Sequence, residues 1–219
     1  MFRKTLILFI LLCCSLQAFN QDLFVPESYL GLKLGGNGSS VLFTPPVKQE
    51  MYFGFVGGVV YKYFGQRNLG IQLELNYLQA GWLEKLDSPD SYSRRLNYLQ
   101  LPFMTHINLG KKKTRVVINL GPYVSFLLSE KEQMKLETED DAESYYETEI
   151  DNSGDFGLSF GLGLLRHTSI GTIQLEGRLN QGLSSVYKSG FETTFEYSRN
   201  QIIEVALYYM FDIRRKKSP

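Results

Sequence analysis

Apolar side chains recur at every second position over long stretches of this chain, and this period constrains the fold more than any other feature of the sequence. In Leu69–Trp82, apolar side chains at the odd positions up to Tyr77 alternate with Gly70, Gln72, Glu74 and Asn76. The same alternation is found in Phe156–Leu164, Thr168–Val186 and Ile203–Phe211. A period of two is the pattern of a strand with one apolar and one polar face, so these four segments are expected to be strands.

Four further segments show apolar residues at alternate positions and complete the expected set of strands. They are Tyr29–Gly36, Tyr52–Phe64, Asn97–Leu109 and Arg115–Leu128. The composition agrees, because 15 Phe and 14 Tyr against seven Pro suit pleated sheets. An apolar content of 43% excludes a disordered chain, and a mean hydropathy of −0.16 excludes a bundle of membrane helices. The sequence therefore predicts an all-β domain of eight strands.

The first eighteen residues form an export signal rather than part of the fold. Arg3 and Lys4 precede an apolar run of about ten residues, which is half the length of a membrane-spanning helix. We expect cleavage after Ala18, with acylation of Cys14 as a lipoprotein the alternative. Both cysteines lie in this signal, so the exported chain has neither a disulfide nor a thiolate metal site. The barrel domain is expected over 19–213, followed by a basic tail over 214–219.

The connections between the expected strands alternate between long and short. Short basic connections include 65–68, 110–113 and 166–168. Longer polar connections span about Asn37–Met51, Leu83–Leu96, Ser129–Gly154 and Tyr187–Gln201. In an up-and-down antiparallel meander, the odd connections lie at one end and the even ones at the other. The alternation of short and long connections therefore predicts a barrel with short turns at one rim and long loops at the other. Outer-membrane barrels have this asymmetry, with short periplasmic turns and long extracellular loops.

Periodicity alone does not say which face looks outward, and a soluble lipid-binding barrel would place its apolar face inside. Opposite charges on separate strands favour the reverse arrangement, because a narrow lumen requires paired side chains. This expected lumen charge cluster comprises Glu74, Glu176, Arg178 and Glu204. We interpret it as an internal salt-bridge plug, with a functional charge relay as the alternative.

Aromatic residues near strand ends also favour an outward apolar face, because their amphipathic rings prefer the membrane interface. The expected interface aromatics are Tyr61, Tyr63, Tyr77, Trp82, Tyr209 and Phe211. Unpaired strand edges are costly in hydrocarbon, so the eight strands must close into a ring. The sequence thus predicts an eight-stranded antiparallel transmembrane β-barrel in the outer membrane, contacting outer-membrane lipid, with little room for a pore.

The segment Ser129–Asp155 contains eleven acidic residues and two lysines. Its densest part comprises Glu139, Asp140, Asp141 and Glu143. Carboxylates can bind divalent cations, but the spacing and glycine of a calcium loop are missing, so we expect a solvated extracellular loop. The overall charge gives no indication of nucleic-acid binding.

The sequence shows no arrangement that predicts catalysis, a cofactor or a metal site. The two histidines, His106 and His167, fall near the short-turn rim. A lipid-modifying barrel enzyme would need a catalytic group near Leu83–Leu96 or Tyr187–Gln201, and neither segment contains histidine. A passive small-solute porin is the leading alternative to a binding role.

Three segments resemble the PorT-like outer-membrane barrels of Bacteroidetes, a porin family. They are LELNYLQAG at 73–81, NYLQLP at 97–102 and INLGPY at 118–123, followed by a last strand that ends in an aromatic residue. The resemblance implies an eight-stranded barrel acting as a structural, binding or assembly component of the envelope. Because one branch of that family is associated with type IX secretion, it also implies envelope or secretion-system proteins as partners. The chain departs from many such barrels in continuing for eight residues beyond Phe211.

Overall fold

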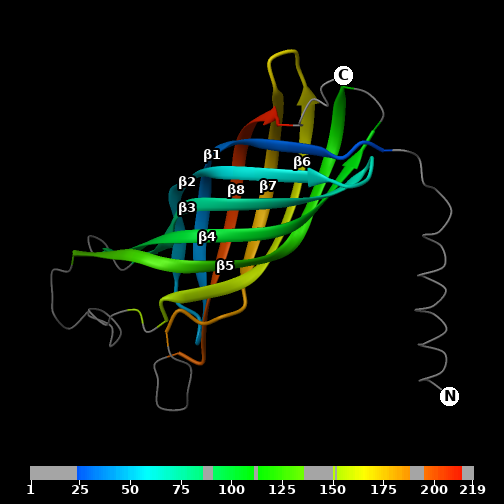
Figure 1. Cartoon of the computed structure of the whole chain (residues 1–219). Helices are drawn as coiled ribbons and strands as arrows, with labels where there is room; N and C mark the ends of the chain where they lie inside the picture. The colour runs from blue at the N-terminus through cyan, green and yellow to red at the C-terminus, as the bar shows by residue number, and fades with distance from the viewer. Residues whose placement is uncertain are drawn as a thin grey trace, which may run out of the picture.

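The protein forms a closed ring of eight antiparallel strands, in which β1 pairs with both β2 and β8 (Figure 1). The computed structural model describes residues 24–85, 91–110, 113–135, 150, 152–187 and 195–213. The strands are β1 (Glu27–Thr44), β2 (Gln49–Phe64), β3 (Leu69–Lys85), β4 (Ser91–Leu109), β5 (Thr114–Lys135), β6 (Gly154–His167), β7 (Thr172–Gly182) and β8 (Tyr197–Asp212). The predicted all-β fold with eight antiparallel strands is therefore confirmed.

Several predicted features fall outside the described residues. These are the signal at 1–18, the tail at 214–219 and the acidic group of Glu139, Asp140, Asp141 and Glu143. Within the described ranges, no helix is long and apolar enough to cross a membrane.

The outer face of the barrel is apolar and its lumen is polar. Leu73, Leu162 and Leu207 point outward and are 37%, 53% and 53% exposed. On β3, the neighbouring residues Gln72 and Glu74 are buried in the interior. A soluble protein does not expose an apolar surface that runs around its whole circumference. The soluble lipid-binding alternative therefore fails, and the outer face is a lipid-contacting surface.

The apolar part of the outer face forms a band around the barrel. At the end of this band that is farther from the short turns, the outward-facing side chains are four amides and one hydroxyl. Gln79 on β3 donates to Asn97 on β4 over 3.3 Å, and Asn97 donates to Ser129 on β5 over 2.8 Å. Across the barrel, Gln201 on β8 donates to Gln181 on β7 over 2.8 Å. We call these five residues the amide belt. Side chains that satisfy one another in this way suit the boundary between hydrocarbon and water.

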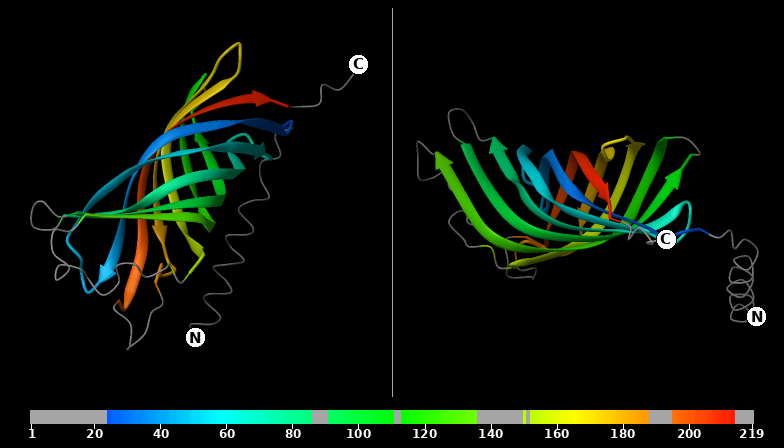
Figure 2. Two further views of the ribbon diagram at one scale, coloured as in Figure 1. Left: turned by 90° about the vertical axis from the view of Figure 1, so that its left-hand side faces the viewer. Right: turned by 45° about the horizontal axis from the view of Figure 1, so that its top comes forward.

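The connections after β1 and β3 are much shorter than the sequence predicted. β1 continues to Thr44 and β2 begins at Gln49, while β3 continues to Lys85 and β4 begins at Ser91. Most of the expected loops Asn37–Met51 and Leu83–Leu96 are therefore paired strand. Beyond the amide belt, β3, β4 and β5 project as a sheet, which Figure 2 shows rising past the ends of β6 and β7.

The prediction was wrong because the apolar pattern changes sides above the amide belt while the backbone ladder continues. On β1, the inward residues Val41 and Phe43 are buried, whereas Ser40 faces the other side. Once the strands leave the hydrocarbon, their outward side chains are in water and only their inward side chains need to be apolar. Above that height most outward side chains are polar, although Leu42 on β1 is 50% exposed, and in the sequence this change resembles the end of a strand.

The position of the bilayer along the barrel axis can be tested by placing arginine at two outward-facing leucines, one in the middle of the apolar band and one at its end. Leu207 lies in the middle of the apolar band and Leu128 lies beside the amide belt, and their exposed fractions are 53% and 55%. We expect Leu207→Arg to lower the free energy of unfolding by about 2–4 kcal/mol and Leu128→Arg by about 0–1 kcal/mol. Denaturant titration of the barrel folded in vesicles measures both values. Equal costs would contradict the assigned height of the bilayer.

Candidate functional site in the barrel lumen

An ion pair crosses the middle of the lumen between β7 and β3. Nη1 and Nη2 of Arg178 donate to the two carboxylate oxygens of Glu74 over 2.9 and 2.7 Å. Nε of Arg178 donates to Glu176 over 2.9 Å and lies 3.4 Å from Glu204 on β8. All four side chains are buried. The charged residues singled out in the sequence therefore meet in one network, held by the bidentate geometry that guanidinium and carboxylate favour.

Two lysines that the sequence analysis did not include complete this network. Nζ of Lys33 on β1 lies 3.1 Å from Glu74 and 2.7 Å from Glu204. Lys62 on β2 is also buried, donates to Gln174 and lies 5.8 Å above the ring of Tyr208. The lumen network then contains three cations and three carboxylates, so its formal charges balance. The signal was available, because Lys33 alternates with Leu32 and Leu34, just as Glu74 alternates with leucines on β3.

Neutral side chains satisfy much of the remaining bonding capacity of the carboxylates. Asn119 on β5 and Gln174 on β7 donate to Glu176 over 2.7 and 2.6 Å, and Asn76 donates to Glu74 over 2.8 Å. The Tyr208 hydroxyl accepts from Arg178 over 2.8 Å. Charges removed from water are tolerable only when they are paired and hydrogen-bonded in this way.

The network fits inside eight strands because a glycine lies beside it on the neighbouring strand β6. Gly161 on β6 pairs with Arg178, and a Cβ atom at Gly161 would lie 2.2 Å from Oε1 of Glu176. Any larger residue would therefore displace the carboxylate. Gly177, which faces outward on β7, has no comparable neighbour, its nearest contact being 4.0 Å away. The inward glycines thus provide the volume that the long charged side chains occupy.

Above the amide belt, the lumen is closed by an apolar cluster, which we call the cap. Its large members are Phe43, Trp82, Tyr92, Tyr187 and Phe195. The ring of Phe43 lies 4.5 Å from Phe195 and 5.4 Å from Trp82, measured between centroids. Such ring pairs stabilise a packed cluster beyond the area that they bury.

Trp82 is a correction to the predicted interface aromatics. It is completely buried in the cap, and its indole Nε1 donates to Glu84 over 2.7 Å. The period of two explains this position, because Trp82 shares the even-numbered, inward face of β3 with Glu74, whereas Tyr77 faces outward. The prediction grouped Trp82 with Tyr77 because both lie near the strand end. It overlooked that even-numbered and odd-numbered residues of β3 point to opposite faces.

The other predicted interface aromatics lie on the outer face. Tyr63 and Phe211 near the short-turn rim are 39% and 52% exposed, and Tyr77 near the opposite end of the apolar band is 37% exposed. Tyr61 and Tyr209 are partly exposed, and the Tyr209 hydroxyl donates to the carbonyl oxygen of Ile170 over 2.8 Å. These positions suit rings that contact lipid headgroups, which stays a prediction.

Arg94 ties the cap to β5. Its guanidinium lies 2.9 Å from Glu130 and donates to the Tyr187 hydroxyl over 2.8 Å. Burial raises the pKa of Tyr187 to about 12, so the phenol remains a neutral acceptor for Arg94 at any ordinary pH. The segment that follows β7 is thereby fastened over the mouth of the barrel.

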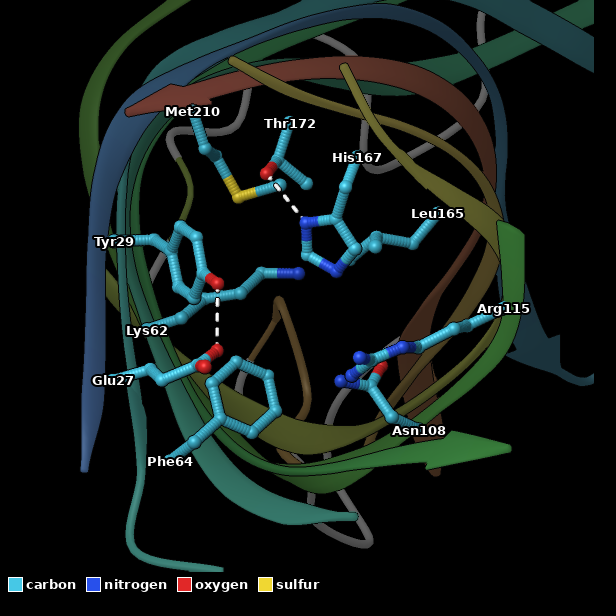
Figure 3. A pocket seen from close by; sticks show the side chains of 10 residues that line it. All are labelled: Glu27, Tyr29, Lys62, Phe64, Asn108, Arg115, Leu165, His167, Thr172 and Met210. Atoms are coloured by element: carbon cyan, nitrogen blue, oxygen red, sulfur yellow. Dashed lines mark hydrogen bonds between the residues drawn. The ribbon is translucent and has the colours of Figure 1, made fainter. Parts of the chain in front are cut away.

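At the short-turn end, Tyr29 and Phe64 line the lumen, and Lys62 points from between them toward the barrel axis (Figure 3). His106 is buried here between Asn108 and Asn119, and its ring packs 5.3 Å from Phe64. His167 pairs with Thr172 over 3.0 Å. Neither histidine is hydrogen-bonded to a nucleophilic serine or cysteine among the described residues, nor do the described residues contain a cluster of metal ligands.

The interdependence of the lumen charges can be tested with a double-mutant cycle. Replacing Arg178 by Met leaves Glu74 and Glu176 with one cation fewer, so we expect a loss of about 3–5 kcal/mol in the free energy of unfolding. Adding Glu74→Gln restores the charge balance, so the double variant should be more stable than Arg178→Met alone. Denaturant titration in vesicles measures the coupling. Additive losses would show that the pair is not energetically linked.

A family model described as "Outer membrane protein beta-barrel domain" matches residues 20–188. Among curated proteins, no significant sequence match was found. The solved structure of the outer membrane protein OprG from Pseudomonas aeruginosa superposes with a TM-score of 0.53 at 9% identity, covering 85% of this chain and 96% of that chain.

Two other solved barrels align over similar lengths with lower scores. Ail, the attachment invasion locus protein of Yersinia pestis, has a TM-score of 0.44 at 10% identity, covering 84% of this chain and 99% of that chain. Neisserial surface protein A has a TM-score of 0.41 at 11% identity, covering 86% of this chain and all of that chain.

The description of the matched family does not name the PorT-like group that the sequence resembles, so membership of that group stays a prediction. The closed ring of eight strands and the apolar outer face agree with the family match. This chain belongs to the outer membrane protein β-barrel domain family and is a small β-barrel of the bacterial outer membrane.

Proposed function

We propose that this barrel is a closed, non-enzymatic scaffold of the outer membrane, which acts as a structural, binding or assembly component through its outer end. The observation that carries the proposal is the network in which Lys33 and Arg178 pair with three glutamates across the lumen. A lumen built for transport would keep charged groups at its walls and water between them. Here the charges from opposite walls contact one another directly.

Three layers of side chains support a closed lumen. The cap fills the outer end, the charge network fills the middle, and Tyr29, Phe64 and Met210 belong to an apolar cluster at the short-turn end. An eight-stranded barrel encloses only enough space for its own side chains. Passage of a solute would require breaking buried ion pairs such as Arg178–Glu74, which is costly when the separated charges stay buried.

The projecting ends of β3, β4 and β5 are the part of the described structure most suited to contact other envelope components. They extend beyond the amide belt, and the outward side chains of Lys131 and Gln133 on β5 are exposed. Arg94, Glu130 and the cap stiffen the inner side of this sheet. A rigid sheet edge outside the membrane offers backbone and side-chain groups to a partner. The resemblance to PorT-like barrels makes secretion-system proteins the first candidates.

Conductance separates this proposal from the porin alternative. The purified chain, reconstituted into planar bilayers, should give a conductance near the baseline, because the paired lumen charges and the cap leave no continuous water path. A general porin inserted under the same conditions serves as the positive control. Regular open-channel steps carried by the folded barrel would overturn the proposal of a closed lumen.

Photo-cross-linking in cells tests the proposed contact surface. A photoreactive phenylalanine at Gln133 faces outward from the projecting sheet, whereas the same residue at Leu162 faces lipid. We expect a discrete adduct with an envelope protein from position 133 and only lipid adducts from position 162. A secretion-system subunit in that adduct would support the more specific role. Identical lipid adducts from both positions would contradict a protein-binding role for the sheet.

A further inference from the structure

The short-turn mouth contains a cleft of about 500 Å³ that the closed-scaffold proposal does not use. It is lined by charged and polar residues from β1, β5 and the β6–β7 turn, and also by Phe211 of β8. Phe211 is 52% exposed on the lipid side of the barrel, and Ile170 in the turn is 71% exposed. The cleft therefore joins the lumen mouth to the lipid-facing surface, over an apolar lip formed by Phe211 and Ile170.

Two side-chain nitrogens in the wall of this cleft have no hydrogen-bond partner among the described residues. Nε of Arg115 and Nε2 of His167 are both buried without a hydrogen-bond partner among the described residues. Figure 3 shows both side chains directed into the mouth from neighbouring strands, with His167 held by Thr172. Buried polar atoms without partners cost stability, so such a pair indicates a place where a group from outside the chain binds. Arg115 Nε is a donor, and Nε2 of His167 is a donor in the tautomer in which the Thr172 hydroxyl donates to Nδ1.

Carboxylates line the same cleft. Glu27 accepts a hydrogen bond from the Tyr29 hydroxyl over 2.7 Å, and Asp212 lies at the end of β8. A carboxylate oxygen accepts more than one hydrogen bond, so Glu27 can also contact a cationic group. A simple anion would meet Arg115 favourably and the two carboxylates unfavourably. A zwitterion can place its negative group at Arg115 and its positive group at Glu27 and Asp212.

We propose that this cleft binds the headgroup of a zwitterionic phospholipid from the periplasmic leaflet, with the phosphodiester at Arg115 and His167 and the ammonium group at Glu27 and Asp212. The short-turn rim of such barrels lies at the periplasmic side, where the leaflet consists of phospholipid. The lip of Phe211 and Ile170 allows the acyl chains to run down the outer face while the headgroup enters the mouth. A cleft of this volume is ample for a headgroup.

Lipid titration of the full-length folded chain in maltoside micelles tests the proposal. The probes are a short-chain phosphatidylethanolamine, the phosphatidylglycerol and the diacylglycerol with the same acyl chains, and free O-phosphoethanolamine. Binding is followed by the 15N resonance of Arg115 Nε and by native mass spectrometry. Phosphatidylethanolamine should bind most tightly and shift the Arg115 Nε resonance, because only this probe carries both charges and both chains.

The matched variants are Arg115→Gln and Arg166→Gln, which remove the same charge from the same rim. Arg166 is exposed and does not line the cleft. Arg115→Gln should weaken phosphatidylethanolamine binding by about tenfold or more, whereas Arg166→Gln should change it by less than about twofold. Should Arg115→Gln fail to fold, His167→Phe keeps the ring volume, removes the Nε2 donor and is expected to weaken binding in the same direction.

Four results would overturn the proposal. Equal losses in the two arginine variants would indicate diffuse attraction to a basic rim. Tighter binding of phosphatidylglycerol would indicate a site for simple anions. Diacylglycerol binding as tightly as phosphatidylethanolamine would show that the headgroup is not recognised, and equal binding of free O-phosphoethanolamine would assign the cleft to a soluble ligand. None of these results depends on whether the lumen conducts.

Discussion

The structure depends first on the requirement that every backbone N–H and C=O group in hydrocarbon has a partner within the protein. A sheet with two free edges would leave rows of these groups unpaired, at a cost of several kcal/mol each. The pairing of β1 with β8 removes both edges. Once the ring is closed at eight strands, the volume inside is fixed, and every inward side chain must share it with residues from the opposite wall. The composition of the lumen is a consequence of this closure.

Closure explains why the lumen combines long charged side chains with glycine. Arg178 reaches Glu74 across the barrel, and the space for this contact comes from positions such as Gly161. In so narrow an interior, a charge without a counter-charge would be strongly unfavourable, and the formal charges of the network balance. The same contacts that satisfy these charges also obstruct the lumen. The same ion pairs therefore stabilise the barrel and obstruct its lumen, which supports the proposed binding or assembly role over transport.

Above the amide belt, the solvent on the outer side changes from hydrocarbon to water, and the amphipathic pattern changes with it. Inward positions occupied by Gln72 and Glu74 in the membrane give way to Trp82 on the same face of β3. The cap therefore resembles the core of a soluble sheet protein, built on the continuation of membrane strands. Phe211 and Ile170 form a similar transition at the opposite rim, where the lipid surface leads into a polar cleft. At both ends of the barrel, the side-chain pattern therefore changes where the outer face passes from hydrocarbon to water.

The sequence by itself determined the strands that cross the membrane and which residues share a face, because side-chain direction in a strand depends only on parity. The opposite charges of Glu74, Glu176, Arg178 and Glu204 on separate strands then favoured placing that face inside and the apolar face outside. The same rule, applied strictly, places Lys33 and Trp82 inside, so these two were predictable. The length of β1 and β3 beyond the membrane was not, since pairing there continues without a continuous apolar outer face. Only the tertiary structure decided which charges meet, because Arg178 and Glu74 are 104 residues apart and their contact follows from register around a closed ring. It also decided that Arg115, His167 and Phe211 share one cleft, since three separate strands bring them to the same rim.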